Sequence, residues 1–134
     1  MNRKGFSLIE LLIVVVIIGI IVIIAVPSLL ESKKVSEEKA AQATLRNIAS
    51  AEMAYIAKSI NTAYGTLANM YTQGNLDDRF STGTATFDGY TFSGTGSSGG
   101  FSFTATPDDG DNTNRRFYIM TDGAIRNNAG NAVQ

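Results

Sequence analysis

The sequence contains no cysteine and no histidine among its 134 residues. The absence of cysteine excludes disulfide bonds, thiolate metal sites and thiol nucleophiles. The absence of histidine removes the commonest general base and the commonest metal ligand. An enzyme would therefore have to work with carboxylates or with a serine–lysine pair, and we expect that the chain is not an enzyme.

The sequence also lacks a large excess of charge of either sign. It carries 11 basic and 12 acidic residues, which gives a net charge of −1. This balance provides no bulk electrostatic attraction to nucleic acid, so we expect no specific nucleic-acid ligand. The basic residues are nevertheless unevenly placed, because Arg3 and Lys4 precede a long apolar run and Lys33, Lys34 and Lys39 follow it.

The apolar run covers residues 6–26 almost without interruption, and Leu11–Val26 is a stretch of 16 residues without a charged or strongly polar side chain. With its apolar flanks the run approaches the ~20 residues that span a bilayer. It is apolar on every face, so no amphipathic stripe directs it toward the core of a small soluble domain. We therefore predict a transmembrane helix over residues 6–30 in a single-pass membrane precursor.

Residues 31–60 are predicted to form the amphipathic half of the same helix. Leu45, Ile48 and Ile56 recur mostly at helical spacing, and alanine is abundant. The charged residues that fall largely between these apolar positions are Lys39, Arg46, Glu52 and Lys58. A continuous helix over residues 6–60 would measure roughly 80 Å. This length exceeds the thickness of a bilayer, so the helix is expected to project from the membrane.

Beyond residue 60 the composition changes to Gly, Thr, Ser, Asn and Asp, and residues 61–134 are predicted to form a small globular head with a loop after the long helix. A short helix is expected from Thr66 to Tyr71, with Thr66 as N-cap and Gly74 as terminator.

Alternating large residues in the head predict a small antiparallel sheet, and therefore an α+β fold. One apolar face of this sheet is the natural cover for the Leu45, Ile48 and Ile56 face of the helix. Residues 93–100 are expected to be a flexible connection because they are almost entirely Gly and Ser. The predicted strands are residues 87–92 (with Tyr90 and Phe92 on one face), 101–105, 116–121 and 124–126, the last two flanking an Asp122-Gly123 turn.

The segment Lys4-Gly5-Phe6-Ser7-Leu8-Ile9-Glu10 resembles the prepilin processing site of type IV pilins and of type II secretion pseudopilins. The resemblance extends to Pro27 and rests on an ordered set of features: a basic leader, a glycine, a phenylalanine and a glutamate that opens a hydrophobic helix. It implies the type IV pilin fold, with a leader peptide of residues 1–5. It also implies that a prepilin peptidase cuts between Gly5 and Phe6 and methylates the new Phe6 amine.

An ordinary secretory signal peptide is the alternative explanation of this N-terminus. Its cleavage site should follow the apolar run closely, but Pro27 and then Glu31, Lys33 and Lys34 stand there. The processing-site interpretation therefore fits the sequence better.

Glu10 needs an explanation because a carboxylate inside a membrane segment costs ~2.5–3.5 kcal/mol on insertion scales. It can lie in the first helical turn, where the helix dipole favours a negative charge. The resemblance implies in addition that Glu10 pairs with the Phe6 amine of its own or a neighbouring subunit and so sets the register of packed helices. Gly19 fits either a tolerated small residue or a close approach of helices. Pro27 fits either a simple kink or a turn that loosens during assembly.

The Asp108–Asn114 segment is rich in oxygen donors, so a calcium site is a candidate. It lacks the spacing of an EF-hand loop, and a solvated turn is the favoured interpretation. We therefore predict no cofactor or metal. Arg115 and Arg116 beside these aspartates are expected to form local charge pairs rather than to contact DNA.

The resemblance implies a structural subunit of a homo-oligomeric type IV pilus filament that serves adhesion, twitching motility or DNA uptake. The expected partners are the prepilin peptidase, the inner-membrane assembly platform and, before assembly, the bacterial inner membrane itself. After assembly the subunit would lie in an extracellular pilus. One alternative is the major pseudopilin of a periplasmic type II secretion pseudopilus, and another is a membrane-anchored binding module that does not polymerise.

Overall fold

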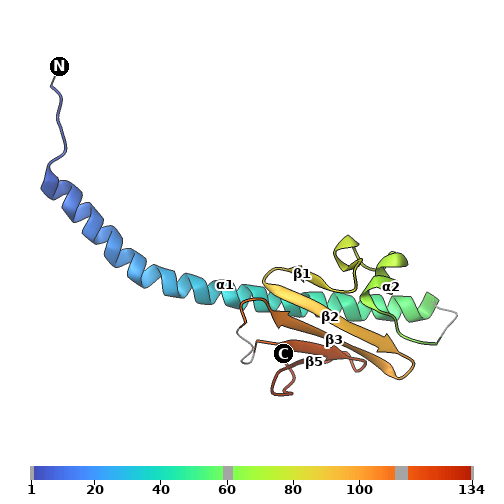
Figure 1. Cartoon of the computed structure of the whole chain (residues 1–134). Coiled ribbons are helices and arrows are strands. Elements are labelled where there is room, and N and C mark those ends of the chain that lie inside the picture. Colours follow the sequence, from blue (N-terminus) through green and yellow to red (C-terminus); the bar gives the residue numbers. More distant parts are fainter. Residues whose placement is uncertain (1, 59–61, 111–114, 134) are drawn as a thin grey trace. The chain divides into compact units, whose positions relative to one another are not determined.

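The computed structural model describes residues 2–58, 62–110 and 115–133. It has one long N-terminal helix and a five-stranded antiparallel sheet, which confirms the predicted α+β class and the layout of the pilin fold (Figure 1). The chain divides into two compact units, Met1–Ser36 and Glu37–Gln134. The elements are α1 (Leu8–Lys58), α2 (Leu67–Thr72), the 3-10 helix η1 (Asp78–Phe80), β1 (Ala85–Phe87), β2 (Tyr90–Ser97), β3 (Gly100–Pro107), β4 (Phe117–Met120) and β5 (Ile125–Asn127).

Helix α1 begins at Leu8, two residues later than expected, and its described part ends at Lys58. The predicted end at residue 60 lies outside the described residues. Pro27 lies inside the helix, which is continuous through it. Because proline has no amide hydrogen, it cannot donate the usual helical hydrogen bond. Next to it, the Ser28 hydroxyl donates to the Ala25 carbonyl at 3.0 Å.

The second unit begins where α1 is first covered by the head. The buried positions of the helix follow helical spacing and lie under the sheet, as Figure 1 shows for the later part of α1. Leu45 and Ile48 are fully buried, as predicted, while Ile56 is half-buried. The buried residues of α1 are Ala41, Gln42, Leu45, Ile48, Ala51 and Glu52.

The five strands follow one another in chain order, each antiparallel to the next. Side chains of one face alternate inward with a period of two, so this face packs on α1 and the other faces outward. Phe92 pairs with Ala105, and Phe103 pairs with Ile119, which places the large core residues side by side across three strands. The buried residues of β2 to β5 on this face are Tyr90, Phe92, Phe101, Phe103, Ala105, Pro107, Phe117, Ile119 and Ile125.

The predicted single strand over residues 87–92 is wrong. Phe87 ends β1 and Tyr90 begins β2, with a tight turn at Asp88-Gly89 between them. Both turn residues have positive φ, 53° and 75°. A two-residue Asp-Gly loop with this geometry is the favoured hairpin connection, and it is the same dipeptide that was used to predict the Asp122-Gly123 turn. Tyr90 and Phe92 do share one buried face, as predicted.

The predicted flexible connection over residues 93–100 is also wrong. Residues 93–97 continue β2 and pair with β3, leaving Ser98 and Gly99 as the turn. The glycines in this strand allow close packing of neighbouring segments and do not form a flexible connection. A Cβ added at Gly96 would lie 2.4 Å from the Cβ of Tyr64, and one added at Gly94 would lie 2.2 Å from the Ser102 carbonyl oxygen.

The predicted short helix and the last two strands are confirmed as α2, β4 and β5. The Thr66 hydroxyl accepts the Asn69 amide at 3.2 Å and so caps α2. After β5 the chain folds back along the outer edge of that strand. There the Val133 amide donates to the Ile125 carbonyl at 2.8 Å, and the Asn127 amide donates to the Asn131 carbonyl at 3.0 Å.

Candidate functional site

The start of α1 is built by a capping box between Ser7 and Glu10. The Ser7 hydroxyl accepts the Glu10 amide at 3.3 Å, and Oε2 of Glu10 accepts the Ser7 amide at 2.8 Å. A Ser-x-x-Glu sequence satisfies two backbone amides that the first helical turn leaves without partners. The Ser7-x-x-Glu10 spacing is the local sequence signal for this helix cap.

Gly5 and Phe6 precede the helix, at the peptide bond predicted to be cut. The Phe6 side chain is 84 % exposed. A Cβ added at Gly5 would meet no atom within 4 Å in the described part of the chain. In the uncut chain the Phe6 nitrogen is a peptide amide, so the ammonium that would pair with Glu10 arises only on cleavage. The pairing of Phe6 with Glu10 therefore stays a prediction.

The first unit presents an uncovered apolar surface. Residues 2–36 are all exposed, and none of the long apolar stretch of α1 in this range is buried. By length and composition this helix can cross a membrane. A Cβ added at Gly19 would meet no atom of another segment within 4 Å in the described residues, so the predicted role of Gly19 in close helix packing would need a second helix.

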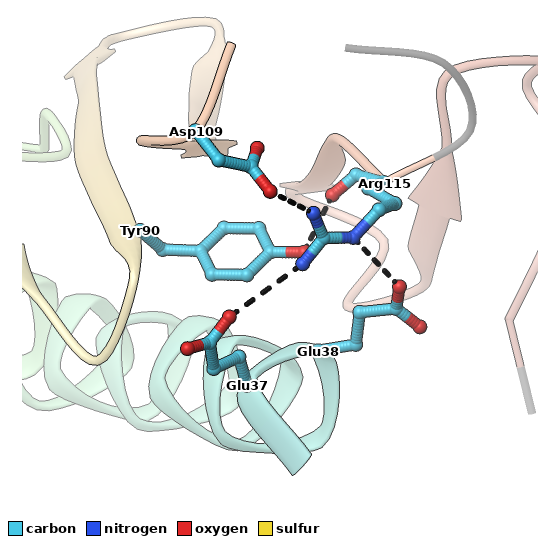
Figure 2. A network of polar contacts seen from close by, with 5 residues as sticks. All are labelled: Glu37, Glu38, Tyr90, Asp109 and Arg115. Atoms are coloured by element: carbon cyan, nitrogen blue, oxygen red, sulfur yellow. Dashed lines mark hydrogen bonds and ion pairs between the residues drawn. The ribbon is translucent and has the colours of Figure 1, made fainter. Parts of the chain in front are cut away.

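A second polar cluster lies in the head around Arg115, drawn in Figure 2. The predicted local pairing of Arg115 with an aspartate is confirmed, because its Nη1 donates to Asp109 at 2.6 Å. Two helix residues also take part. Nε of Arg115 donates to Glu38 at 3.0 Å, and Nη2 lies 3.6 Å from Oε2 of Glu37. No local pattern predicts this contact, since Glu38 is 77 positions away in sequence.

Tyr90 completes this cluster from the sheet. Its hydroxyl donates to the Arg115 carbonyl at 2.9 Å. Burial raises the pKa of Tyr90 to about 12, although the Arg115 charge acts in the opposite direction. Burial lowers the pKa of Arg115, but the hydrogen bonds to Asp109 and Glu38 raise it, and the net pKa lies above the ordinary value. The guanidinium therefore stays charged.

Glu52 is fully buried, although the sequence placed it among the charged residues between the apolar positions of α1. Its Oε2 accepts the Gly65 amide at 3.1 Å, while its Oε1 has no hydrogen-bond partner in the described part of the chain. Burial raises the pKa of Glu52, and the hydrogen bond from Gly65 offsets part of this rise. The carboxyl group thus ties the later part of α1 to the start of the head.

The calcium candidate falls partly outside the described residues, which omit 111–114. Of the two aspartates that are described, Asp108 accepts the Thr91 hydroxyl at 2.7 Å and Asp109 is paired with Arg115. In the described ranges no group of three or more acidic side chains is arranged to hold a metal ion. A calcium site over the Asp108–Asn114 segment stays a prediction.

Comparison with known proteins finds a family match for the N-terminal segment. The family described as the prokaryotic N-terminal methylation motif matches residues 1–26. Neither the curated proteins nor the solved structures include a match to the chain. The matched motif is the signature of the type IV pilins and pseudopilins that prepilin peptidase processes. The chain therefore carries the N-terminal signature of these proteins at residues 1–26, followed by a long apolar helix, and in these two features it is similar to a type IV pilin or pseudopilin.

Proposed function

We propose that the chain is the structural subunit of a helical type IV pilus filament and that it polymerises through its hydrophobic N-terminal helix. The observation that supports this most directly is the combination of the methylation motif with the aliphatic surface of residues 8–30, which nothing in the described chain covers. Such a surface needs either lipid or other helices around it. A filament of like helices provides the second environment.

Processing prepares the helix for this exchange. Before cleavage, Arg3 and Lys4 of the leader favour the cytoplasmic side of the inner membrane for the N-terminus. Cleavage after Gly5 removes both charges and creates an ammonium group on Phe6. Glu10 lies in the first helical turn and holds a carboxylate whose Oε2 is bound to the Ser7 amide. The new ammonium, of the same or a neighbouring subunit, would neutralise it.

Assembly would then replace lipid by neighbouring helices. Apolar area alone gains little in this exchange, because lipid chains are as apolar as aliphatic side chains. Close packing, to which Gly19 contributes, and the Glu10 pair would therefore select the register of the helices. Pro27, which leaves the carbonyl four residues before it without a helical donor, would allow the helix to adapt during the transfer.

The experiment is recovery of the native polypeptide from its bacterium. Sheared surface material is inspected by electron microscopy, and the N-terminus of the subunit is determined by mass spectrometry. The proposal predicts long external fibres whose subunit begins with methylated Phe6. Fibres absent from the surface, together with a defect in secretion when the chain is deleted, would instead indicate a pseudopilus. A soluble monomer that still begins at Met1 would overturn both.

A further inference from the structure

The coverage of α1 begins at two neighbouring glutamates. Every residue from 2 to 36 is exposed, Glu37 and Glu38 are half-buried, and Ala41 is the first fully buried residue of the helix. Any pull on the preceding helix therefore reaches the head first at Glu37 and Glu38. Contacts at this turn are therefore the first between helix and head to bear such a pull.

Arg115 connects this turn of the helix to the sheet region. Its side chain is 9 % exposed and binds Glu38 at 3.0 Å and Asp109 at 2.6 Å, with Glu37 at ion-pair distance. In Figure 2 the guanidinium lies between the helix residues on one side and Asp109 on the other. One planar group thus connects α1 with the end of β3 and the start of β4.

The turn between β1 and β2 is shaped to admit Glu37. A Cβ added at Gly89 would lie 2.8 Å from the Glu37 carboxyl carbon. Gly89 also has a φ of 75°, and its carbonyl accepts the Asp108 amide at 2.9 Å. The absence of a side chain at Gly89 therefore leaves room for the Glu37 carboxylate beside Arg115.

We infer that Arg115 is a clamp that fastens the first covered turn of α1 to the sheet and resists separation of the head when the helix is pulled. The inference rests on the proposed function only for the source of the pull, and its test needs no filament. Removing the guanidinium would leave Glu37, Glu38 and Asp109 together without their shared cation. Glu37 and Glu38 are half-buried, so the loss of this cation would weaken the attraction that holds the turn to the sheet region and leave like charges close together.

The test is amide hydrogen exchange of the full chain in detergent micelles, followed by mass spectrometry. The test variant is Arg115→Ala, and Arg115→Lys keeps the charge without the fork of donors. The matched control is Arg126→Ala, because Arg126 forms an ion pair that is confined to the Asp122 turn. The reporters at the clamp are the amides of residues 39–44 and of Asp108. The reporters at the opposite end of the contact are the amides of Tyr64 and Gly96, which donate to Ser97 and Gly65.

The clamp predicts about tenfold faster exchange at its own reporters in Arg115→Ala, with a smaller increase in Arg115→Lys. The distant reporters should stay unchanged, and Arg126→Ala should alter neither set. Unchanged exchange at residues 39–44 in Arg115→Ala would overturn the inference. A uniform rise at both sets would also overturn it, because it would assign Arg115 to overall stability. If Arg115→Ala does not fold, Glu38→Gln provides the same comparison with a milder loss.

Discussion

Glu52 illustrates at the scale of one residue how a fold holds a charge-bearing group that its sequence would have left in water. One carboxyl oxygen accepts the Gly65 amide, and the other has no partner within the described residues. Ionising such a group is unfavourable because the buried charge loses its hydration. The head is thus tied to α1 by a carboxyl group whose charged form is disfavoured by burial.

The pH dependence of stability follows from this raised pKa. The unfolded chain releases the Glu52 proton near the ordinary value of 4.5, whereas the folded chain holds it to higher pH. The contribution of Glu52 to stability is therefore fully present below pH 4.5 and is lost as the pH rises through the folded-state pKa. Glu52→Gln should raise the Tm at pH 7 by several degrees and leave it almost unchanged at pH 4.

Thermal unfolding of the full chain in detergent micelles, followed by circular dichroism at both pH values, checks this prediction. Glu31→Gln is the matched control, because Glu31 lies exposed on the same helix. An equal or lower Tm of Glu52→Gln at pH 7 would show that the ionised carboxylate is the preferred state in the folded chain.

Two substitutions of Glu10 distinguish its observed helix cap from its predicted charge pair. Glu10→Gln keeps an oxygen that can accept the Ser7 amide but removes the charge, whereas Glu10→Leu removes both. If the charge pair sets the register, both variants should strongly reduce the amount of sheared filament. Immunoblots of sheared and cell-bound fractions measure this, with total subunit as the control. Normal assembly of both variants would remove charge pairing from the mechanism, and normal assembly of Glu10→Gln alone would leave only the helix cap.

At the scale of elements, local periodicity predicted the helix and strand whose side-chain pattern lies within one segment. The helical spacing of Leu45 and Ile48 and the alternation of Phe101 and Phe103 gave the helix and a strand correctly. The strand over residues 93–97 was missed because Gly and Ser carry little side-chain pattern. Its place in the sheet is set by what lies across from it, which a single segment does not reveal.

The β2–β3 hairpin allows a matched test of the close packing between Gly96 and the segment at Tyr64 and Gly65. Gly96→Ala would place a methyl group 2.4 Å from the Tyr64 Cβ and 2.7 Å from the Gly65 carbonyl oxygen. We expect this overpacking to lower the free energy of unfolding by about 1–3 kcal/mol. Gly99→Ala, in the same hairpin, meets its nearest atom only at 3.9 Å and should change stability little. Urea unfolding of both variants measures the difference, and equal stabilities would contradict the role assigned to Gly96.

At the scale of the whole molecule, the N-terminal methylation motif could be recognised from the sequence, whereas the contacts of Arg115 with α1 could not. Gly5, Phe6 and Glu10 are neighbours in sequence, so their order alone carries the motif. Arg115 and Glu38 meet only because the sheet returns the chain to the helix, 77 positions later. Contacts of this kind depend on the completed fold and have no local sequence pattern.

The division into two units makes a prediction about solubility. All buried core residues lie in the second unit, and the uncovered aliphatic residues of α1 lie mainly in the first. A fragment of residues 31–134 should therefore remain a soluble, folded monomer without detergent, whereas the full chain should need it. Gel filtration and circular dichroism of both check this. Aggregation or loss of the cooperative unfolding of the fragment would show that the head depends on the first unit.

The C-terminal segment that folds back along β5 affects how closely packed heads can aggregate. Its bonds to β5 occupy backbone groups at that border of the sheet, through Val133 and Asn131. Edge strands with unpaired backbone groups can pair with strands of other chains and so start amyloid-like aggregation. Because the C-terminal segment pairs with this edge, heads that are packed closely together are less able to form intermolecular strand pairs through β5. Removal of the last residues should accordingly increase aggregation of the protein.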